Sequence, residues 1–350
     1  MGANRLPNRV LMAPLTRNRA LPDGTPQEMT QAYYGQRASA GLIITEATQI
    51  SNMGKGYLNT PGIYLDKHVE SWRKITNTVH ASGGRIFVQL WHVGRISHRS
   101  ILPEGHSPVA PSAIKANAQV FTASGFEDTS PPVALDTDGI VETINDFRRA
   151  AQAAKDAGFD GVEVHAANGY LVDQFLQDGT NTRDDNYGGS FDNRARLLNA
   201  VLDVVGETWP MDQIGVRLSP LGQANDISDS DPEALFSYVY KMLSARKLAY
   251  LHVVEQFPGV DVGAEDAAMM ARLRKQYDGF YIGNGGYDAD RASEAVKSGH
   301  ADAIAFGRPF IANPDLPERY RVGAPLNGPN GETFYGGDET GYIDYPFLIQ

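Results

Sequence analysis

Residues 160–171 read Asp-Gly-Val-Glu-Val-His-Ala-Ala-Asn-Gly-Tyr-Leu, and the β-branched residues before His165 favour a short buried strand. Asn168 and Tyr170 follow within a few residues, so two hydrogen-bond donors, His165 and Asn168, share one loop with the phenol of Tyr170. Just before this stretch, residues 139–157 carry apolar side chains at alternating spacings of four and three, which is the pattern of an amphipathic helix. The order of helix, strand and polar loop is typical of an α/β barrel, where catalytic residues lie on the loops after the strands.

The same alternation of strand and helix patterns runs along the whole chain. The candidate strands are residues 10–13, 42–45, 86–90, 161–164, 214–218, 250–254, 280–282 and 303–306. The candidate helices are residues 26–39, 66–81, 139–157, 193–205, 231–246, 264–277 and 288–298. Eight strands with helices between most of them predict an α/β fold, a (β/α)8 TIM barrel that forms a single domain over residues 1–350.

Two further features bear on this prediction. A doubly wound sheet, the alternative α/β fold, would place its nucleotide site at a glycine-rich turn after the first strand. The residues that follow the first candidate strand are Pro-Leu-Thr-Arg-Asn-Arg, which include no glycine.

Residues 91–135 form a long stretch that is rich in Ser, Pro and Ala and has little periodicity, so we expect it to cap the barrel mouth after the third strand.

The composition excludes several classes of protein and site. The 350 residues carry a formal net charge of −11, which argues against nucleic acid or an acidic membrane as a partner. The chain has no cysteine, which excludes a disulfide scaffold and a cysteine-ligated iron–sulfur cluster. No apolar run is long enough to span a membrane, and the amino terminus lacks a signal-peptide pattern. We therefore expect a cytoplasmic protein without a metal site, as a monomer or a homodimer.

Glycines and one arginine follow the last two candidate strands. Gly285 and Gly286 come after the seventh strand, and Gly307 and Arg308 come after the eighth. The loops at these two positions of a TIM barrel often bind phosphate through backbone N–H groups. Arg308 can add a bidentate contact to such a phosphate. The sequence therefore predicts a phosphate site at this edge of the barrel.

Thr16, Gln89 and Arg217 predict a polar ring around the barrel mouth. A glutamine offers both a donor and an acceptor, whereas an arginine offers only donors. This set suits a flat heterocycle with amide and imide edges, and a phosphorylated flat heterocycle is a description of FMN. Taken alone, Gln89 or Arg217 is equally well explained by a hydrogen bond inside the barrel.

With these residues in place, the chain resembles the old yellow enzyme family of FMN-dependent ene-reductases. It is most similar to the bacterial branch that includes the N-ethylmaleimide, pentaerythritol tetranitrate and glycerol trinitrate reductases. One matching stretch is Gln-Leu-Trp-His-Val-Gly-Arg-Ile-Ser-His at residues 89–98. The others are residues 8–17, 34–48, 165–171, 181–196, 305–308, 313–316 and 334–337. Together they cover almost the whole chain.

The resemblance implies a role for each candidate residue. It implies that the ring of FMN contacts Pro14, Thr16, Ala47, Gln89 and Arg217, and that the phosphate lies at Gly285, Gly286, Gly307 and Arg308. It also implies that His165 and Asn168 bind the carbonyl or nitro oxygen of the substrate, and that Tyr170 is the proton donor. Trp91 and Tyr57 are expected to line the substrate pocket.

The chain departs from the family pattern in three places. Members usually carry a further segment before the first strand, a hairpin that closes the bottom of the barrel. This sequence begins at the end of that segment, so we expect either that it is truncated or re-annotated, or that the bottom of the barrel is unusually open. Many bacterial members have a second histidine where this chain has Asn168, which also offers a donor. Residues 254–266 look shorter than in close relatives, which would open the pocket.

These observations predict an NAD(P)H-dependent flavin oxidoreductase that reduces activated C=C bonds in α,β-unsaturated carbonyl and nitro compounds. The expected cycle is ping-pong: NADPH or NADH reduces FMN, hydride passes from FMN N5 to Cβ, and Tyr170 protonates Cα. Reduction of nitrate esters or nitroaromatic compounds at the same site is the alternative. A cofactor-free sugar-phosphate lyase or isomerase would need a lysine or a carboxylate base at a strand end. No lysine occupies such a position, and Glu46 and Glu255 are the only carboxylate candidates. A flavin-storage protein would not need Tyr170.

Overall fold

The computed structural model describes residues 1–222 and 224–348. In this part of the chain, eight parallel strands close into a barrel, in the order β1-β2-β3-β8-β9-β10-β11-β12 around the ring. They are β1 (Val10–Met12), β2 (Ile43–Gln49), β3 (Ile86–Trp91), β8 (Gly161–His165), β9 (Ile214–Leu218), β10 (Tyr250–Val254), β11 (Tyr281–Asn284) and β12 (Ala303–Phe306). Every predicted strand is present, and the prediction of a TIM barrel is confirmed.

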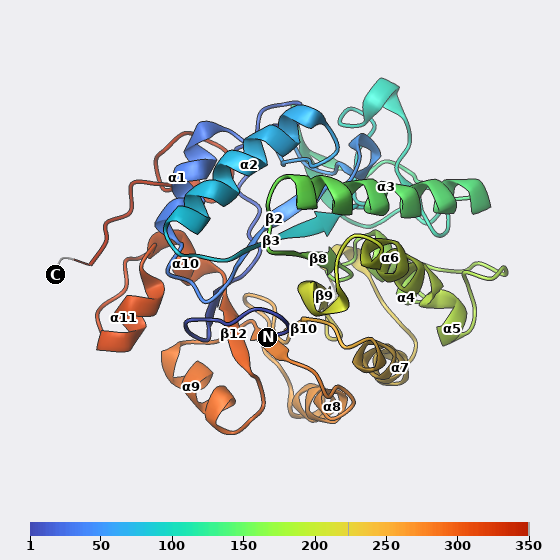
Figure 1. The fold of residues 1–350 in the computed structure, drawn as a ribbon. Helices are drawn as coiled ribbons and strands as arrows, with labels where there is room; N and C mark the ends of the chain where they lie inside the picture. The colour runs from blue at the N-terminus through green and yellow to red at the C-terminus, as the bar shows by residue number, and fades with distance from the viewer. Residues whose placement is uncertain (223, 349–350) are drawn as a thin grey trace.

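Helices surround the barrel, which Figure 1 views along its axis. Those of the described residues are α1 (Glu28–Gln36), α2 (Asp66–Ala81), α3 (Thr137–Asp156), α4 (Leu171–Leu176), α5 (Phe191–Arg194), α6 (Arg196–Gly206), α7 (Pro232–Ala245), α8 (Ala264–Arg274), α9 (Ala289–Lys297), α10 (Arg308–Ala312) and α11 (Leu316–Val322). The predicted helix 193–205 is divided at Ala195 into α5 and α6. None of the helices in the described ranges is long and apolar enough to cross a membrane.

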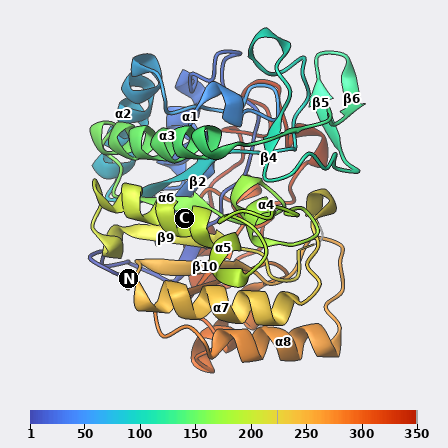
Figure 2. The same cartoon turned by 90° about the vertical axis from the view of Figure 1, so that its right-hand side faces the viewer.

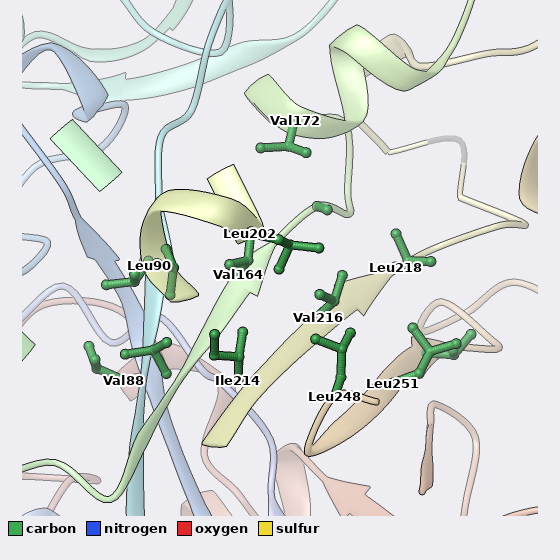
Figure 3. Packing of buried hydrophobic residues seen from close by; sticks show 14 of the residues in the cluster. Val88, Leu90, Val164, Val172, Leu202, Ile214, Val216, Leu218, Leu248 and Leu251 are labelled. Atoms are coloured by element: carbon green, nitrogen blue, oxygen red, sulfur yellow. The ribbon is translucent and has the colours of Figure 1, made fainter. Parts of the chain in front are cut away.

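The outer faces of the strands pack against these helices. Val88 on β3, Val164 on β8 and Val216 on β9 belong to one buried cluster, together with Leu202 of α6 and Val172 of α4 (Figure 3). Side chains alternate between the two faces of a strand. The residues between these valines and leucines therefore point into the barrel, and they decide what the barrel can hold.

Apolar side chains fill the amino-terminal half of the barrel. Phe87 and Tyr250 are its bulkiest members, and both are fully buried. Glycines on the neighbouring strands leave room for these rings. A Cβ atom on Gly161 would lie 2.3 Å from Phe87, and one on Gly215 would lie 2.2 Å from Tyr250. The lower barrel is thus a tightly packed plug.

The first residues of the chain lie at this end of the barrel, and Figure 1 shows the amino terminus in front of its centre. Met1 and Leu6 pack against the cluster that contains Phe87 and Tyr250. The expectation of an unusually open barrel bottom is therefore not met in this structure. Large side chains fill the barrel from within, and the start of the chain packs against them.

The stretch between β3 and α3 forms the expected cap. It contains an antiparallel hairpin of β5 (Gln119–Thr122) and β6 (Gly125–Asp128), and a short parallel pair of β4 (Val109–Ala110) and β7 (Val133–Ala134). Figure 2 shows the hairpin at the end of the molecule opposite the amino terminus. The cap therefore stands over the carboxyl ends of the barrel strands, where catalytic loops are found in this fold.

Strand β2 is longer than predicted because it tolerates an irregularity. It extends to Gln49, and its pairing with β3 shifts register between Ile44 and Ala47. At the shift, the hydroxyl oxygen of Tyr34 accepts a hydrogen bond from the backbone N–H of Glu46. The Tyr34 hydroxyl thus takes the place of a backbone acceptor on the neighbouring strand. Ala47 therefore lies within β2 rather than after it.

The packing of the lower barrel predicts that Gly215→Ala destabilises the protein. The new methyl group would overlap the Tyr250 ring, and overpacking a core typically costs about 1–3 kcal/mol. Urea unfolding of both proteins would measure the difference. Gly328→Ala is the matched control, because no atom lies within 4 Å of a Cβ placed there. Equal stabilities of the two variants would contradict the role of Gly215.

Candidate active site

A cavity of about 1010 Å³ opens at the carboxyl end of the barrel, with residues of the β5–β6 hairpin in its wall. The loops after β1, β8, β11 and β12 supply much of the remaining wall. The sequence-predicted residues that line it are Pro14, Thr16, Tyr57, Asn168, Tyr170, Arg217, Gly285, Gly286, Gly307 and Arg308. Loops that are distant in the chain thus meet in one place, as the barrel predicts.

The other predicted site residues lie behind this wall. They are Ala47, Gln89, Trp91 and His165, and each has an exposed fraction of 5% or less. Ala47 and Trp91 belong to an apolar cluster against which Tyr57 and Tyr170 pack. Ala47 and Trp91 therefore support two tyrosines of the cavity.

Tyr170 belongs to an aromatic group in the cavity wall. Its hydroxyl lies 3.1 Å from the hydroxyl of Tyr57. Its ring makes edge contacts with Trp91 and His165, with 5.1 Å between the ring centroids in each pair. Burial raises the pKa of Tyr170, while Tyr57 and Asn225 oppose the shift. The phenol therefore keeps its proton at neutral pH.

Asn168 follows β8 in the left-handed conformation, with φ at +60°, which asparagine adopts more readily than most residues. Its backbone N–H donates to Oγ of Ser219 over 2.8 Å, and its carbonyl oxygen accepts from Nδ2 of Asn225 over 2.8 Å. Its Oδ1 is buried without a partner among the described residues. The backbone is thus fixed by residues that follow β9, while the side-chain amide remains free to bind a ligand.

His165, the last residue of β8, is a neutral donor. Burial lowers the pKa of His165 to about 3, and the charge of Arg217 adds to the shift. The backbone N–H of Ala167 donates to Nδ1 of His165 over 3.4 Å, so the ring proton is on Nε2. A neutral imidazole of this tautomer can donate a hydrogen bond to a ligand oxygen.

A layer of polar side chains lies inside the barrel above the apolar plug. This polar layer consists of Gln89, Glu163, Arg217, His252 and Asn284. Gln89 Nε2 donates to Glu163 Oε1 over 2.7 Å, which leaves the glutamine oxygen as an acceptor. Arg217 donates through one terminal nitrogen to Asn284 Oδ1 over 2.9 Å, and its Nε is buried without a partner among the described residues.

Sequence reasoning missed three members of this layer: Glu163, His252 and Asn284. The signal for the first two was present, because each interrupts an otherwise apolar strand at an inward-facing position. A buried charged residue requires a partner, but the partner comes from another strand, and the spacing within one strand does not identify it.

The glycines of the predicted phosphate site have a second explanation. Gly285 and Gly286 have φ values of +102° and +66°. A Cβ on either would lie 2.1 Å or less from an oxygen of Gln256, which belongs to the loop after β10. Packing against the Gln256 backbone therefore requires Gly285, and the positive φ favours glycine at 286, so their presence alone does not indicate a phosphate. Arg308 is more informative, because it is exposed at the start of α10 and lines the cavity without an ion pair among the described residues.

The carboxyl-terminal segment also contributes to the cavity, which the sequence did not indicate. Phe334, Tyr335 and Gly336 are part of the wall. Arg17 holds this segment, because its Nε donates to the carbonyl oxygen of Phe334 and its NH2 to that of Gly341, each over 2.8 Å. Arg17 directly follows Thr16, so one loop supplies a cavity residue and anchors another part of the wall.

Comparison with known proteins identifies the family of the chain. The structure of morphinone reductase is 52% identical in sequence, with a TM-score of 0.95 over 99% of this chain and 94% of that chain. The old yellow enzyme homologue from Zymomonas mobilis is 45% identical, with a TM-score of 0.95 over 99% of this chain and 98% of that one. The model of the NADH:flavin oxidoreductase / NADH oxidase family matches residues 1–327. The chain belongs to the old yellow enzyme family.

Among curated relatives of this old yellow enzyme, 12-oxophytodienoate reductase 1 of Oryza sativa subsp. japonica is 44% identical over 352 residues, which are 99% of this chain and 91% of that one. A further structure of morphinone reductase is in complex with tetrahydroNAD. The family resemblance seen in the sequence is thus confirmed, and the protein is an enzyme of the NADH:flavin oxidoreductase family.

The residues of this old yellow enzyme fit a flavin. The family implies such a cofactor. A flavin needs donors at its pyrimidine edge, and the unpartnered Nε of Arg217 is a buried donor in a residue that lines the cavity. A phosphorylated flavin also needs a cation at its far end, and Arg308 is one.

The environment of His165 predicts that its ring stays neutral from about pH 5 to about pH 8, since its pKa is lowered to about 3 from an ordinary value of about 6.5. In the unfolded chain His165 would bind a proton at a higher pH than in the folded protein. The contribution of His165 to the free energy of unfolding is therefore fully present above about pH 6.5 and is lost as the pH falls toward about 3. Histidine ¹⁵N spectra at several pH values, assigned with His165→Asn, would report the protonation. A titration near the ordinary pKa would contradict the neutral donor.

Proposed function

We propose that this old yellow enzyme is an FMN-dependent ene-reductase that uses NADPH or NADH to reduce the activated C=C bond of α,β-unsaturated carbonyl and nitro compounds. The observation that supports it most directly is the position of Tyr170. A protonated phenol lies in one cavity wall with the amide of Asn168 and in ring contact with the neutral imidazole of His165. Two donors and an acid on one loop are the groups that hydride addition to a polarised alkene requires.

The two donors have the task of polarising the substrate. Nε2–H of His165 and the amide of Asn168 would donate hydrogen bonds to the carbonyl or nitro oxygen, on which negative charge develops as hydride adds at Cβ. Both groups are neutral, and His165 is almost fully buried, at 4% exposed. Hydrogen bonds in such a water-poor site favour the developing charge more than they would in bulk solvent.

Tyr170 would then supply the proton. The phenolic proton of Tyr170 would pass to Cα, and with the hydride that bound, reduced FMN would supply, it would complete the saturated product. Burial raises the pKa of the phenol, which opposes loss of the proton before the carbon becomes basic. Tyr57 lies 3.1 Å away and is placed to orient the hydroxyl.

The other residues of the predicted site would hold the cofactor. Arg217 would face N1 and O2 of the flavin, Gln89 would present its oxygen to the pyrimidine edge, and Thr16 would bind O4. Pro14 and Ala47 would contact the ring. Arg308 would hold the phosphate, beside the glycines at 285, 286 and 307. We further propose that the protein acts on small activated alkenes, with Trp91 behind Tyr57 and Tyr170 shaping the pocket.

The purified protein should be yellow and release FMN in a one-to-one ratio on acid treatment, as chromatography would show. Arg308→Ala should weaken FMN binding by about 1.5–3 kcal/mol, since it removes a charge-assisted contact. Arg321→Ala is the matched control, because that arginine is exposed and pairs with Glu318. Release of FAD, or no flavin after reconstitution, would refute the cofactor assignment.

Tyr170→Phe keeps the ring and removes only the acidic proton. NADPH should reduce its flavin at nearly the parent rate, while oxidation by cyclohexenone should slow by about 10²-fold or more. A nitroalkene should be affected less, because its nitronate is stable enough to be protonated in water. Stopped-flow measurement of the two half-reactions would separate these effects.

The companion variant Tyr57→Phe removes the neighbouring hydroxyl and leaves the acid, so it should retain most of the oxidative rate. An unchanged rate in Tyr170→Phe with both acceptors would mean that another group donates the proton. Equal slowing of both half-reactions would instead indicate damage to folding or to nicotinamide binding.

A further inference from the structure

Three charged or titratable side chains form a continuous chain inside the barrel. Arg217 NH1 lies 2.5 Å from Nε2 of His252, and Nδ1 of His252 lies 2.8 Å from Oε2 of Glu163. Glu163 and His252 are fully buried, and Arg217 is 6% exposed. The three residues come from β9, β10 and β8, so the chain links three strands across the barrel interior.

The hydrogen-bonding groups of Arg217 and Glu163 determine which ring nitrogen of His252 carries the proton. A carboxylate only accepts, so Nδ1 of His252 carries the ring proton and donates a hydrogen bond to Glu163 Oε2. NH1 of Arg217 lies 2.5 Å from Nε2 and 3.1 Å from Nδ1, so it rests against the ring on the side of the unprotonated Nε2. Burial lowers the pKa of His252 to about 4, with Arg217 adding to the shift, which agrees with a neutral ring.

The same contacts fix the orientation of the Arg217 guanidinium. NH1 is held by His252, and NH2 donates to Asn284 Oδ1, whose amide is itself tied to the carbonyl oxygen of Ala305 over 2.7 Å. With both terminal nitrogens engaged, the group cannot rotate freely. Nε remains as a buried donor without a partner among the described residues, in a side chain that lines the cavity.

We propose that His252 and Glu163 are positioning residues for the cofactor. His252 holds the Arg217 guanidinium against the pyrimidine edge of the flavin, and the Glu163 carboxylate offsets part of the positive charge of Arg217 at that edge. The inference rests on the proposed function, because it takes the group beside Arg217 to be FMN. Reduction places negative charge on the pyrimidine edge, so a fixed cation there favours the reduced cofactor. The Glu163 carboxylate opposes this effect through the same chain.

The two residues should therefore shift the flavin potential in opposite directions. His252→Leu removes the acceptor for NH1, frees Arg217 and should lower the potential. Glu163→Gln keeps the shape but removes the opposing charge, and should raise it. Each change should alter the ratio of affinities for reduced and oxidised FMN by about tenfold, which is about 30 mV in a two-electron potential. His252→Gln should restore most of the parent value, since an amide can accept from Arg217 and donate to Glu163.

The experiment measures the midpoint potential of the FMN-loaded parent and variants against a reference dye, together with FMN affinity. Ile282→Val is the matched control, because Ile282 is buried beside His252 in the strand register and has no polar group. It should leave the potential unchanged. Shifts of the same sign in His252→Leu and Glu163→Gln, or a shift in the control as large as theirs, would overturn the proposal.

A second measurement needs neither flavin nor a variant that folds. Histidine ¹⁵N spectra of the flavin-free parent at neutral pH should show a neutral ring with its proton on Nδ1 for His252. A charged ring or the other tautomer would overturn the proposed arrangement. Protein that binds no flavin in any form would refute the proposed function as well, whereas protein that binds FMN with unshifted potentials in the variants would refute only the roles of His252 and Glu163.

Discussion

A carboxylate inside a barrel must be compensated by a cation, and the structure meets this requirement by placing Glu163 and Arg217 on opposite sides of His252. Burial opposes ionisation of Glu163, yet His252 and Arg217 together hold its pKa below its usual range. Burial also lowers the pKa of Arg217 to about 10, which still leaves it charged at neutral pH. The barrel interior is thus balanced in charge, with Arg217 as the member that reaches the cavity.

The rest of the barrel follows from this arrangement. Below the polar layer, Phe87 and Tyr250 fill the interior against Gly161 and Gly215, so the polar groups have no access to solvent from that side. Above it lies the cavity, whose wall includes residues of the β5–β6 hairpin. Arg217 is therefore reached by a ligand through the cavity at the carboxyl end of the barrel.

Burial also determines the chemical state of the groups beside the cavity. It lowers the pKa of His165 and raises that of Tyr170, so both are neutral donors in the same pH range. A charged imidazole or a phenolate would be a poorer match to a substrate that is itself uncharged before hydride addition. The same removal of water that neutralises these groups strengthens the hydrogen bonds that they can make.

Much of the protein could be predicted from its sequence. Strand and helix patterns depend on neighbouring residues, so periodicity identified all eight strands, while the length and low periodicity of residues 91–135 indicated the cap. Tyr170, Asn168, Arg217 and Arg308 were selected from their places after or within strands, and all four line the cavity. Only the tertiary structure revealed that His252 contacts both Arg217 and Glu163, that the Gln256 backbone requires Gly285, and that Arg17 holds the segment around Phe334. The reason is physical: a local pattern shows that a side chain is buried, but its hydrogen-bond partner comes from a distant strand or loop, and closure of the barrel alone brings the two together.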